Sequence, residues 1–246
     1  MNNKFQNSKE WAKMLANFLI SMYENEKLDK YKLSDWISTI FLAWAPWAWK
    51  TEFLETVLVS ESFMVIDIDK YRSYFEWYNW KNADLYQDSS SRVATKIFDY
   101  CIKKDLKVIF DGTLTSEMWV KNIKKSLDKN RKIWIILIYQ DPIISYLYTI
   151  LRQENNERKV SIEAFLRIYY NSIKYCFEVS QKYKNIEFII WSKDKNRKRQ
   201  QMVFTNKDRF DKKFNIEYNS DDLKEKLEKL KEKNILQLIQ WLWKKD

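Results

Sequence analysis

The chain has 246 residues, of which 46% are hydrophobic and 32% charged, enough for one large α/β domain with its own core. The sequence contains no run of about 18 apolar residues and no signal-peptide pattern, so we expect a cytoplasmic protein without a membrane partner. The absence of histidine excludes catalytic triads that use it, and the isolated Cys101 and Cys176 indicate buried free thiols.

The formal charge of +10 does not by itself indicate a nucleic-acid partner. Lysines alternate with acidic residues on the predicted helices, as in residues 223–233, which is typical of a solvated helix face. The densest basic run, Lys193 to Arg199, is interpreted as a solvated loop, with contact to an acidic partner as the alternative. We therefore do not expect nucleic-acid binding.

Predicted helices and strands alternate along the chain. Apolar periodicity predicts helices at residues 8–24, 50–60, 90–104, 116–129, 162–182 and 220–242, and one that begins at Pro142. Buried strands are predicted at residues 37–43, 63–68, 106–110, 132–139 and 186–190. This alternation predicts an α/β fold, with a parallel sheet of about five strands covered by helices on both faces. We expect a single domain over residues 1–246, with its core at about 37–191 and extra helices at both ends.

The first predicted strand leads into a loop that nearly matches a phosphate-binding motif. The loop reads Trp44-Ala45-Pro46-Trp47-Ala48-Trp49-Lys50-Thr51. With glycine at each tryptophan, it would match G-x-x-x-x-G-K-[ST] between a strand and a helix. Its backbone would then hold the phosphates of ATP, Lys50 would reach the β- and γ-phosphates, and Thr51 would bind Mg²⁺. The alternative is an ordinary Lys-Thr pair at the start of a helix.

The three tryptophans conflict with that role, because an indole would fill the space of the phosphates. The chain contains one glycine, Gly112, and twelve tryptophans, whereas average usage would give about 17 glycines. We hypothesise that UGA encodes glycine in the source organism, as in some bacterial lineages, and appears here as tryptophan. The hypothesis extends to Trp119, Trp134 and Trp191. The last two lie at predicted strand ends, where a turn glycine would fit.

Polar residues follow the predicted strands, at the edge where parallel sheets bind ligands. Asp111 is interpreted as a metal-binding acid, and a turn residue in Asp-Gly is about equally well supported. Asp69 is a candidate base that accepts a proton from a substrate hydroxyl, with a helix N-cap or a loop carboxylate as the alternative. Arg152 and Arg158 flank a polar break and are candidates for neutralising a transferred phosphoryl group. Each arginine alone would also fit an ordinary surface position.

From about Ile40 to Ile190 the chain resembles the zeta toxins, a family of P-loop small-molecule kinases. The resemblance is carried by the loop before Lys50-Thr51, Val65-Ile66-Asp67-Ile68-Asp69-Lys70-Tyr71-Arg72, Val108-Ile109-Phe110-Asp111-Gly112-Thr113, Ile138-Tyr139-Gln140-Asp141-Pro142, Ser145-Tyr146-Leu147-Tyr148-Thr149-Ile150-Leu151-Arg152 and Arg158-Lys159-Val160. It implies ATP-dependent phosphorylation of the amino-sugar 3′-hydroxyl of UDP-N-acetylglucosamine, which would block cell-wall precursor synthesis. It also implies a partner, an epsilon-type antitoxin that covers the nucleotide site.

The resemblance also implies roles for individual residues. Asp69 matches the base at the hydroxyl, Lys50 the loop lysine, and Thr113 a substrate-site residue. Arg152 and Arg158 match arginines that clamp the phosphates. We place Asp69, Arg72 and Thr113 in the predicted substrate site, with ATP and Mg²⁺ as cofactors.

Two alternatives to this prediction remain. Another P-loop kinase, acting on a metabolite or an antibiotic, would share the architecture. A catalytically dead nucleotide-fold protein that binds a partner would follow if Trp44, Trp47 and Trp49 are genuine.

Overall fold

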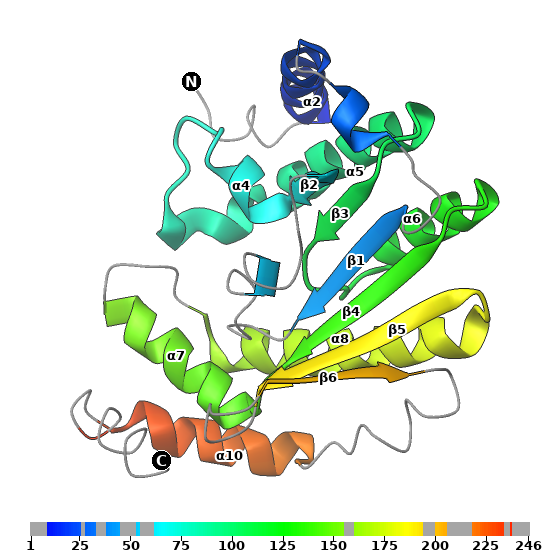
Figure 1. Cartoon of the computed structure of the whole chain (residues 1–246). Coiled ribbons are helices and arrows are strands. Elements are labelled where there is room, and N and C mark those ends of the chain that lie inside the picture. The colour runs from blue at the N-terminus through cyan, green and yellow to red at the C-terminus, as the bar shows by residue number, and fades with distance from the viewer. Residues whose placement is uncertain are drawn as a thin grey trace. The chain divides into compact units, whose positions relative to one another are not determined.

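The computed structural model describes residues 9–25, 28–32, 38–44, 53–54, 62–154, 160–193, 200–205, 218–233 and 237. The strands are β1 (Thr39–Trp44), β2 (Met64–Asp67), β3 (Val108–Asp111), β4 (Ile133–Tyr139), β5 (Ile186–Lys193) and β6 (Gln200–Thr205). The α-helices are α2 (Lys9–Glu24), α4 (Ile68–Arg72), α5 (Gln87–Lys103), α6 (Glu117–Asp128), α7 (Pro142–Glu154), α8 (Ile162–Lys182) and α10 (Ser220–Lys231). Two 3₁₀ helices, η1 (Leu28–Tyr31) and η3 (Trp80–Tyr86), complete the described elements (Figure 1).

The six strands form one sheet in the order β2-β3-β1-β4-β5-β6. The β2–β3 and β3–β1 pairs are parallel, and each strand is a short apolar run of the kind found in buried parallel sheets. The five predicted strands are confirmed. β6 is an addition, and it pairs antiparallel with β5. The pattern of alternating strands and helices therefore predicted the parallel part of the sheet and missed one antiparallel strand.

Most predicted helices are also confirmed, with ends that differ by a few residues. Of the helix predicted at 50–60, only residues 53–54 are described, and both are helical. Of the helix predicted at 220–242, the part from 220 to 231 is confirmed. The short helix α4 was not predicted.

The placement of Trp191 at a strand end was wrong. β5 continues past it to Lys193 because β6 supplies hydrogen-bonding partners, with Trp191 opposite Met202. The indole is also fully buried, so this position lies within a strand and not in a turn.

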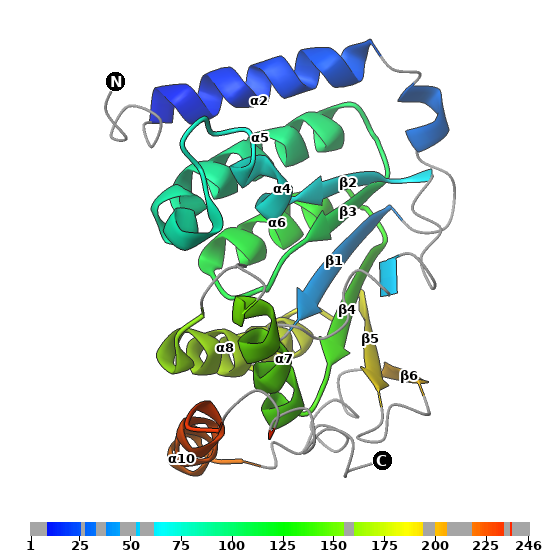
Figure 2. The ribbon, with the colours of Figure 1, turned by 90° about the vertical axis from the view of Figure 1, so that its left-hand side faces the viewer.

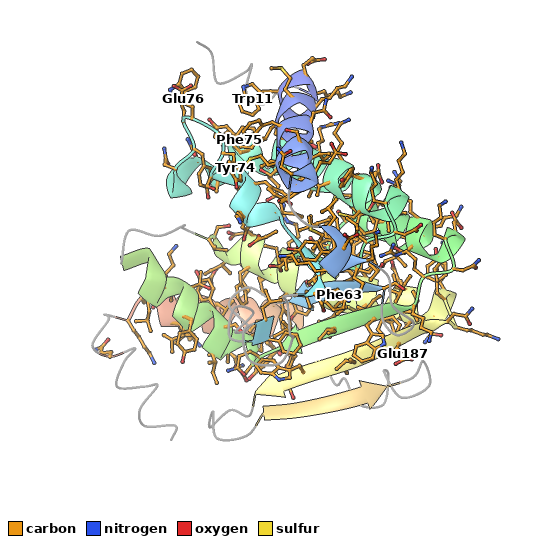
Figure 3. All side chains as sticks on the ribbon, turned by 45° about the horizontal axis from the view of Figure 1, so that its top comes forward. Trp11, Phe63, Tyr74, Phe75, Glu76 and Glu187 are labelled. Atoms are coloured by element: carbon orange, nitrogen blue, oxygen red, sulfur yellow. The ribbon has the colours of Figure 1, made fainter. Side chains whose placement is uncertain are left out.

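The chain divides into two compact units, which we describe separately. The first contains β2, β3, most of β1 and the helices α2, α4, α5 and α6. Helix α2 lies along α5 (Figure 2) and buries one apolar stripe, made of Ala12, Leu15, Ala16 and Leu19. Trp11 of α2 also packs on Phe75, with ring centroids 5.3 Å apart (Figure 3). This contact ties α2 to the turn that follows α4.

Aromatic rings fill the core of the first unit. Phe41 of β1 and Phe110 of β3 lie with ring centroids 6.1 Å apart, and the Trp119 ring of α6 is 4.6 Å from that of Phe110. Phe98 of α5 packs edge-on against Phe110 at 5.3 Å. Such large buried rings contribute much of the hydrophobic stabilisation of a core.

A buried arginine joins the amino ends of two strands in the first unit. Arg131 is 4% exposed, its Nε donates to Thr39 Oγ1 at 2.8 Å, and its Nη2 donates to the Ser38 carbonyl at 2.7 Å. The same Nη2 also donates to the carbonyl of Leu106, just before β3. Burial lowers the pKa of Arg131, and the three acceptors at Nε and Nη2 replace part of the hydration that the guanidinium loses.

The second unit contains most of β4, all of β5 and β6, and the helices α7, α8 and α10. Asp141 begins α7 by accepting hydrogen bonds from the amides of Ile143 and Ile144, with Pro142 at the first helical position. Ser161 caps α8 in the same way, through the amide of Ala164. Across the described residues, no helix combines the length and apolar character needed to cross a membrane.

Candidate functional site

Two aspartates end neighbouring strands of the first unit. Asp67 of β2 and Asp111 of β3 are register partners, and Leu42 of β1 is the partner of Asp111 on its other side. Neighbouring strands lie about 4.8 Å apart, so the two aspartates lie side by side at the carboxyl edge of the sheet. Asp111 is 1% exposed. This edge is where parallel sheets bind ligands, as the sequence predicted.

Asp67 holds the start of α4. Its Oδ1 accepts hydrogen bonds from the amide of Asp69 at 2.9 Å and from the amide of Lys70 at 3.3 Å, so Asp67 is the N-cap. The N-cap role considered for Asp69 therefore belongs to Asp67. Asp69 lies in the first turn, and its side chain is 37% exposed. Ile68 and Tyr71 of this short helix are buried, and burial raises the pKa of Tyr71 well above its usual value.

Arg72 lies one turn along α4 from Asp69. Its side chain is 3% exposed, and its Nη1 lies 2.7 Å from Asp69 Oδ1, forming an ion pair. Its Nη2 donates a hydrogen bond to Oε1 of Gln87, at the start of α5. In this structure Arg72 faces these two side chains, and its contact with a substrate stays a prediction. The sequence did not identify Gln87 as a partner of Arg72, because no local pattern links two residues that are 15 positions apart.

Gly112 follows Asp111 and is in contact with an indole. A Cβ atom at position 112 would lie 2.3 Å from Cζ2 of Trp119, far closer than atoms can approach. The backbone of Gly112 does not have a positive φ. Glycine is therefore needed here for space and not for conformation. Positive φ values occur, within the described chain, only at Asp105, Leu114 and Asn130, so no tryptophan described there adopts a conformation that favours glycine.

The loop after Gly112 belongs to the second unit and contains Thr113. The hydroxyls of Thr113 and Thr115 are 2.8 Å apart, and Ser172 of α8 donates to the Thr113 carbonyl at 2.6 Å. Leu114, between the threonines, is fully buried with φ 51°, which costs a bulky residue about 1–2 kcal/mol. Strain of this size persists where surrounding contacts enforce it, often at functional sites.

The remaining predicted site residues lie partly or wholly outside the described residues. For Trp44 and Arg152 only the backbone is described, at the end of β1 and in α7. The other predicted site residues lie outside the described residues; they are Ala45, Pro46, Trp47, Ala48, Trp49, Lys50, Thr51 and Arg158.

The described residues contain no group of three or more histidine, cysteine or acidic side chains that could hold a metal ion. Mg²⁺ at phosphates needs only one or two carboxylates, because phosphate oxygens and waters complete its six ligands. The buried carboxylate of Asp111 fits that requirement, and the Mg²⁺ site stays a prediction.

Comparisons with known proteins identify the family and the fold. The family model of the zeta toxins matches residues 35–209. A search of curated proteins gave no match. A solved structure of the PezAT chromosomal toxin–antitoxin system of Streptococcus pneumoniae is similar, with a TM-score of 0.60 and 16% identity over 97% of this chain and 96% of that one.

A complex of AvrRxo1-ORF1 with AvrRxo1-ORF2, containing sulphate ions, has a TM-score of 0.65 and 12% identity over 92% of this chain and 82% of that one. The corresponding structure with ATP has a TM-score of 0.57 and 11% identity, over 88% and 75% of the two chains. At such low identities the likeness is one of fold, and it confirms the predicted P-loop kinase-like α/β fold. Because the family model spans most of its length, this chain belongs to the zeta toxin family.

Proposed function

We propose that the protein is an ATP-dependent kinase that transfers the γ-phosphate to a sugar hydroxyl of UDP-N-acetylglucosamine, with Asp69 as the base. Family membership supports a phosphotransferase of the kinase type. The nucleotide sugar, the hydroxyl and the roles of individual residues are our proposal.

The arrangement around Asp69 is the observation that carries the proposal. Asp69 lies in the first turn of α4, two residues after the end of β2, and its side chain is partly exposed at the edge where substrates of parallel α/β folds bind. Asp67 caps the helix and Arg72 binds one oxygen, so the described partners leave the second oxygen, Oδ2, available for a substrate hydroxyl. A base must lie within hydrogen-bonding reach of the proton that it accepts, so the proposal places the substrate hydroxyl next to this oxygen.

The proposed reaction is a direct phosphoryl transfer. The sugar oxygen forms a bond to the γ-phosphorus, the bond between that phosphorus and the β,γ-bridging oxygen breaks, and ADP leaves with the bonding electrons. The hydroxyl proton passes to Oδ2 of Asp69. Because such reactions depend mainly on positioning and charge stabilisation, the proposal needs a fixed carboxylate more than a strong base.

Other residues would bind the phosphates and the metal. Residues 44–51 would hold the ATP phosphates through backbone N–H groups, and Lys50, Arg152 and Arg158 would offset the charge on the transferred group. Thr51 and Asp111 would hold Mg²⁺, which when bound neutralises phosphate charge. We place Thr113 in the substrate site. The loop requires close approach of backbone to phosphate, so the proposal includes glycine at positions 44, 47 and 49.

We also propose an antitoxin partner of the epsilon type and a cytoplasmic location. Support for the partner comes from the similar PezAT structure, which belongs to a toxin–antitoxin system. A kinase acting on a cell-wall precursor would work where that precursor is made.

The test compares two forms of the full chain. One keeps the tryptophans, and the other, the glycine form, carries Trp44→Gly, Trp47→Gly and Trp49→Gly. We expect only the glycine form to bind ATP in calorimetry and to transfer ³²P from γ-labelled ATP to UDP-N-acetylglucosamine. Asp69→Asn in the glycine form should keep ATP binding and lose transfer.

The outcomes separate the parts of the proposal. A glycine form that binds no ATP would refute the kinase. ATP binding without labelling of UDP-N-acetylglucosamine would refute only this substrate and favour another metabolite or antibiotic. Transfer by the Asp69→Asn variant would exclude Asp69 as the base. Mass spectrometry of the protein from its own organism would test the glycines, since tryptophan at positions 44, 47 and 49 would refute UGA recoding.

A further inference from the structure

Arg72 is a buried cation with few partners. Its side chain is 3% exposed, and removing a guanidinium from water costs several kcal/mol unless charge and hydrogen bonds replace the lost hydration. Asp69 supplies the charge through the 2.7 Å contact, which does not have the geometry of a hydrogen bond. Gln87 supplies the hydrogen-bond acceptor that the structure shows for the guanidinium. The orientation of Arg72 therefore depends on Gln87.

Gln87 is itself held in one orientation. Its Nε2 donates to Oγ of Ser91 at 3.2 Å, one turn further along α5, and Ser91 Oγ donates to the Gln87 carbonyl at 2.8 Å. Because the amide nitrogen is engaged by Ser91, the amide oxygen faces Arg72. The result is a continuous chain of contacts, Ser91–Gln87–Arg72–Asp69, that runs from α5 to the proposed base.

We infer that Gln87 is a positioning residue that acts through Arg72 to fix the carboxylate of Asp69. The inference rests on the proposed role of Asp69 as base. An aspartate side chain that is 37% exposed would otherwise sample several rotamers. With Oδ1 held by Arg72, Oδ2 is the oxygen that we assign to the substrate hydroxyl. A misplacement of about 1 Å in a reacting group can lower a rate by about 10²-fold, so loss of this support should reduce turnover.

The experiment replaces the acceptor of Gln87 in the glycine form. Gln87→Met keeps the length of the side chain and removes its acceptor, whereas Gln87→Glu keeps an acceptor at the same reach. We expect Gln87→Met to lower kcat by about 10- to 100-fold, with KM for ATP and for the sugar nucleotide within about twofold. Gln87→Glu should restore kcat to within about threefold of the parent.

Two controls separate positioning from stability. Asp88→Asn changes the next residue, whose carboxylate makes an exposed ion pair with Arg92, and should leave kcat and Tm unchanged. In the Asp69→Asn background, Gln87→Met should leave the low residual rate of transfer unchanged, because the group that it positions is gone. A purely structural role would lower Tm and leave kcat of the folded protein unchanged.

The inference and the function can fail separately. Unchanged kcat in Gln87→Met, or an equal loss in both Asp69 backgrounds, would overturn the inference while leaving the kinase intact. Full transfer by Asp69→Asn would overturn the proposed base. A readout that needs no activity is the crystal structure of Gln87→Met. We expect the Arg72–Asp69 contact to be lost there, and an unmoved carboxylate would also refute the role of Gln87.

Discussion

The indole of Trp119 occupies the space that a Cβ atom on Gly112 would need, with Cζ2 2.3 Å from that position. The two residues are seven positions apart, one just beyond β3 and the other in α6. The size of the side chain at position 119 therefore decides whether position 112 can have a side chain larger than that of glycine. This dependence offers a stability test that requires no substrate.

We expect Gly112→Ala to lower the free energy of unfolding by about 1–3 kcal/mol when residue 119 is tryptophan, because a rigid ring must move. When Trp119→Gly is also present, the same change should be neutral or stabilise by up to about 1 kcal/mol. Urea unfolding of the four proteins in this cycle measures the coupling. An equal cost in both backgrounds would contradict the contact.

The N-cap of α4 gives a second prediction. Asp67→Ala should lower the free energy of unfolding by about 1 kcal/mol, because the amides of Asp69 and Lys70 lose their acceptor. Asp67→Asn is the matched control, since asparagine caps a helix about as well. If both variants lost the same stability in urea, the charge of Asp67 and not its cap would be the cause.

Arg131 gives a third prediction. Arg131→Met should destabilise the protein by about 2–4 kcal/mol, because it leaves the buried carbonyls of Ser38 and Leu106 without this donor. Arg131→Lys should recover little, because an ammonium group cannot reproduce the planar fork. Arg92→Met, at an arginine whose side chain is 41% exposed, should change stability by less than about 0.5 kcal/mol. Similar losses at 92 and 131 would argue against the strand-joining role.

The dependence of stability on pH gives a fourth prediction. Burial raises the pKa of Cys101 to about 12 and that of Tyr146 to about 12. Burial keeps both groups neutral in the folded chain. Each therefore contributes fully to the free energy of unfolding below its pKa in the unfolded chain, and this contribution is lost as the pH rises through its pKa in the folded chain. For Cys101 this loss of stability occurs between about pH 9 and pH 12.

Unfolding in urea should therefore show stability falling above pH 9, with a slope of up to about 1.4 kcal/mol per pH unit for each group. Burial also raises the pKa of Cys176, so Cys101→Ala should roughly halve the slope between about pH 9 and 10, before the tyrosines contribute. The same slope in parent and variant would refute this assignment.

The sequence predicted most of what local patterns can encode. Apolar runs identified five strands, and the charged residues that follow them placed Asp69 and Asp111 at the carboxyl ends of β2 and β3. β6 was missed because Gln200–Thr205 begins with two glutamines after a charged stretch and so lacks the continuous apolar run of the other strands. The contacts of Gln87 and Arg131 were not predicted for a related reason. Their partners lie 15 and 92 residues away, and no periodicity links side chains that meet only after folding.

The two cysteines give the protein a built-in reporter of how it opens. One thiol lies in each compact unit, Cys101 in the first and Cys176 in the second, and both are fully buried. A thiol-alkylating reagent needs an exposed thiolate, so each cysteine reacts only when its own surroundings unfold. The order in which peptides containing positions 101 and 176 acquire the label therefore records which unit loosens first, in a chain that needs no engineered probe.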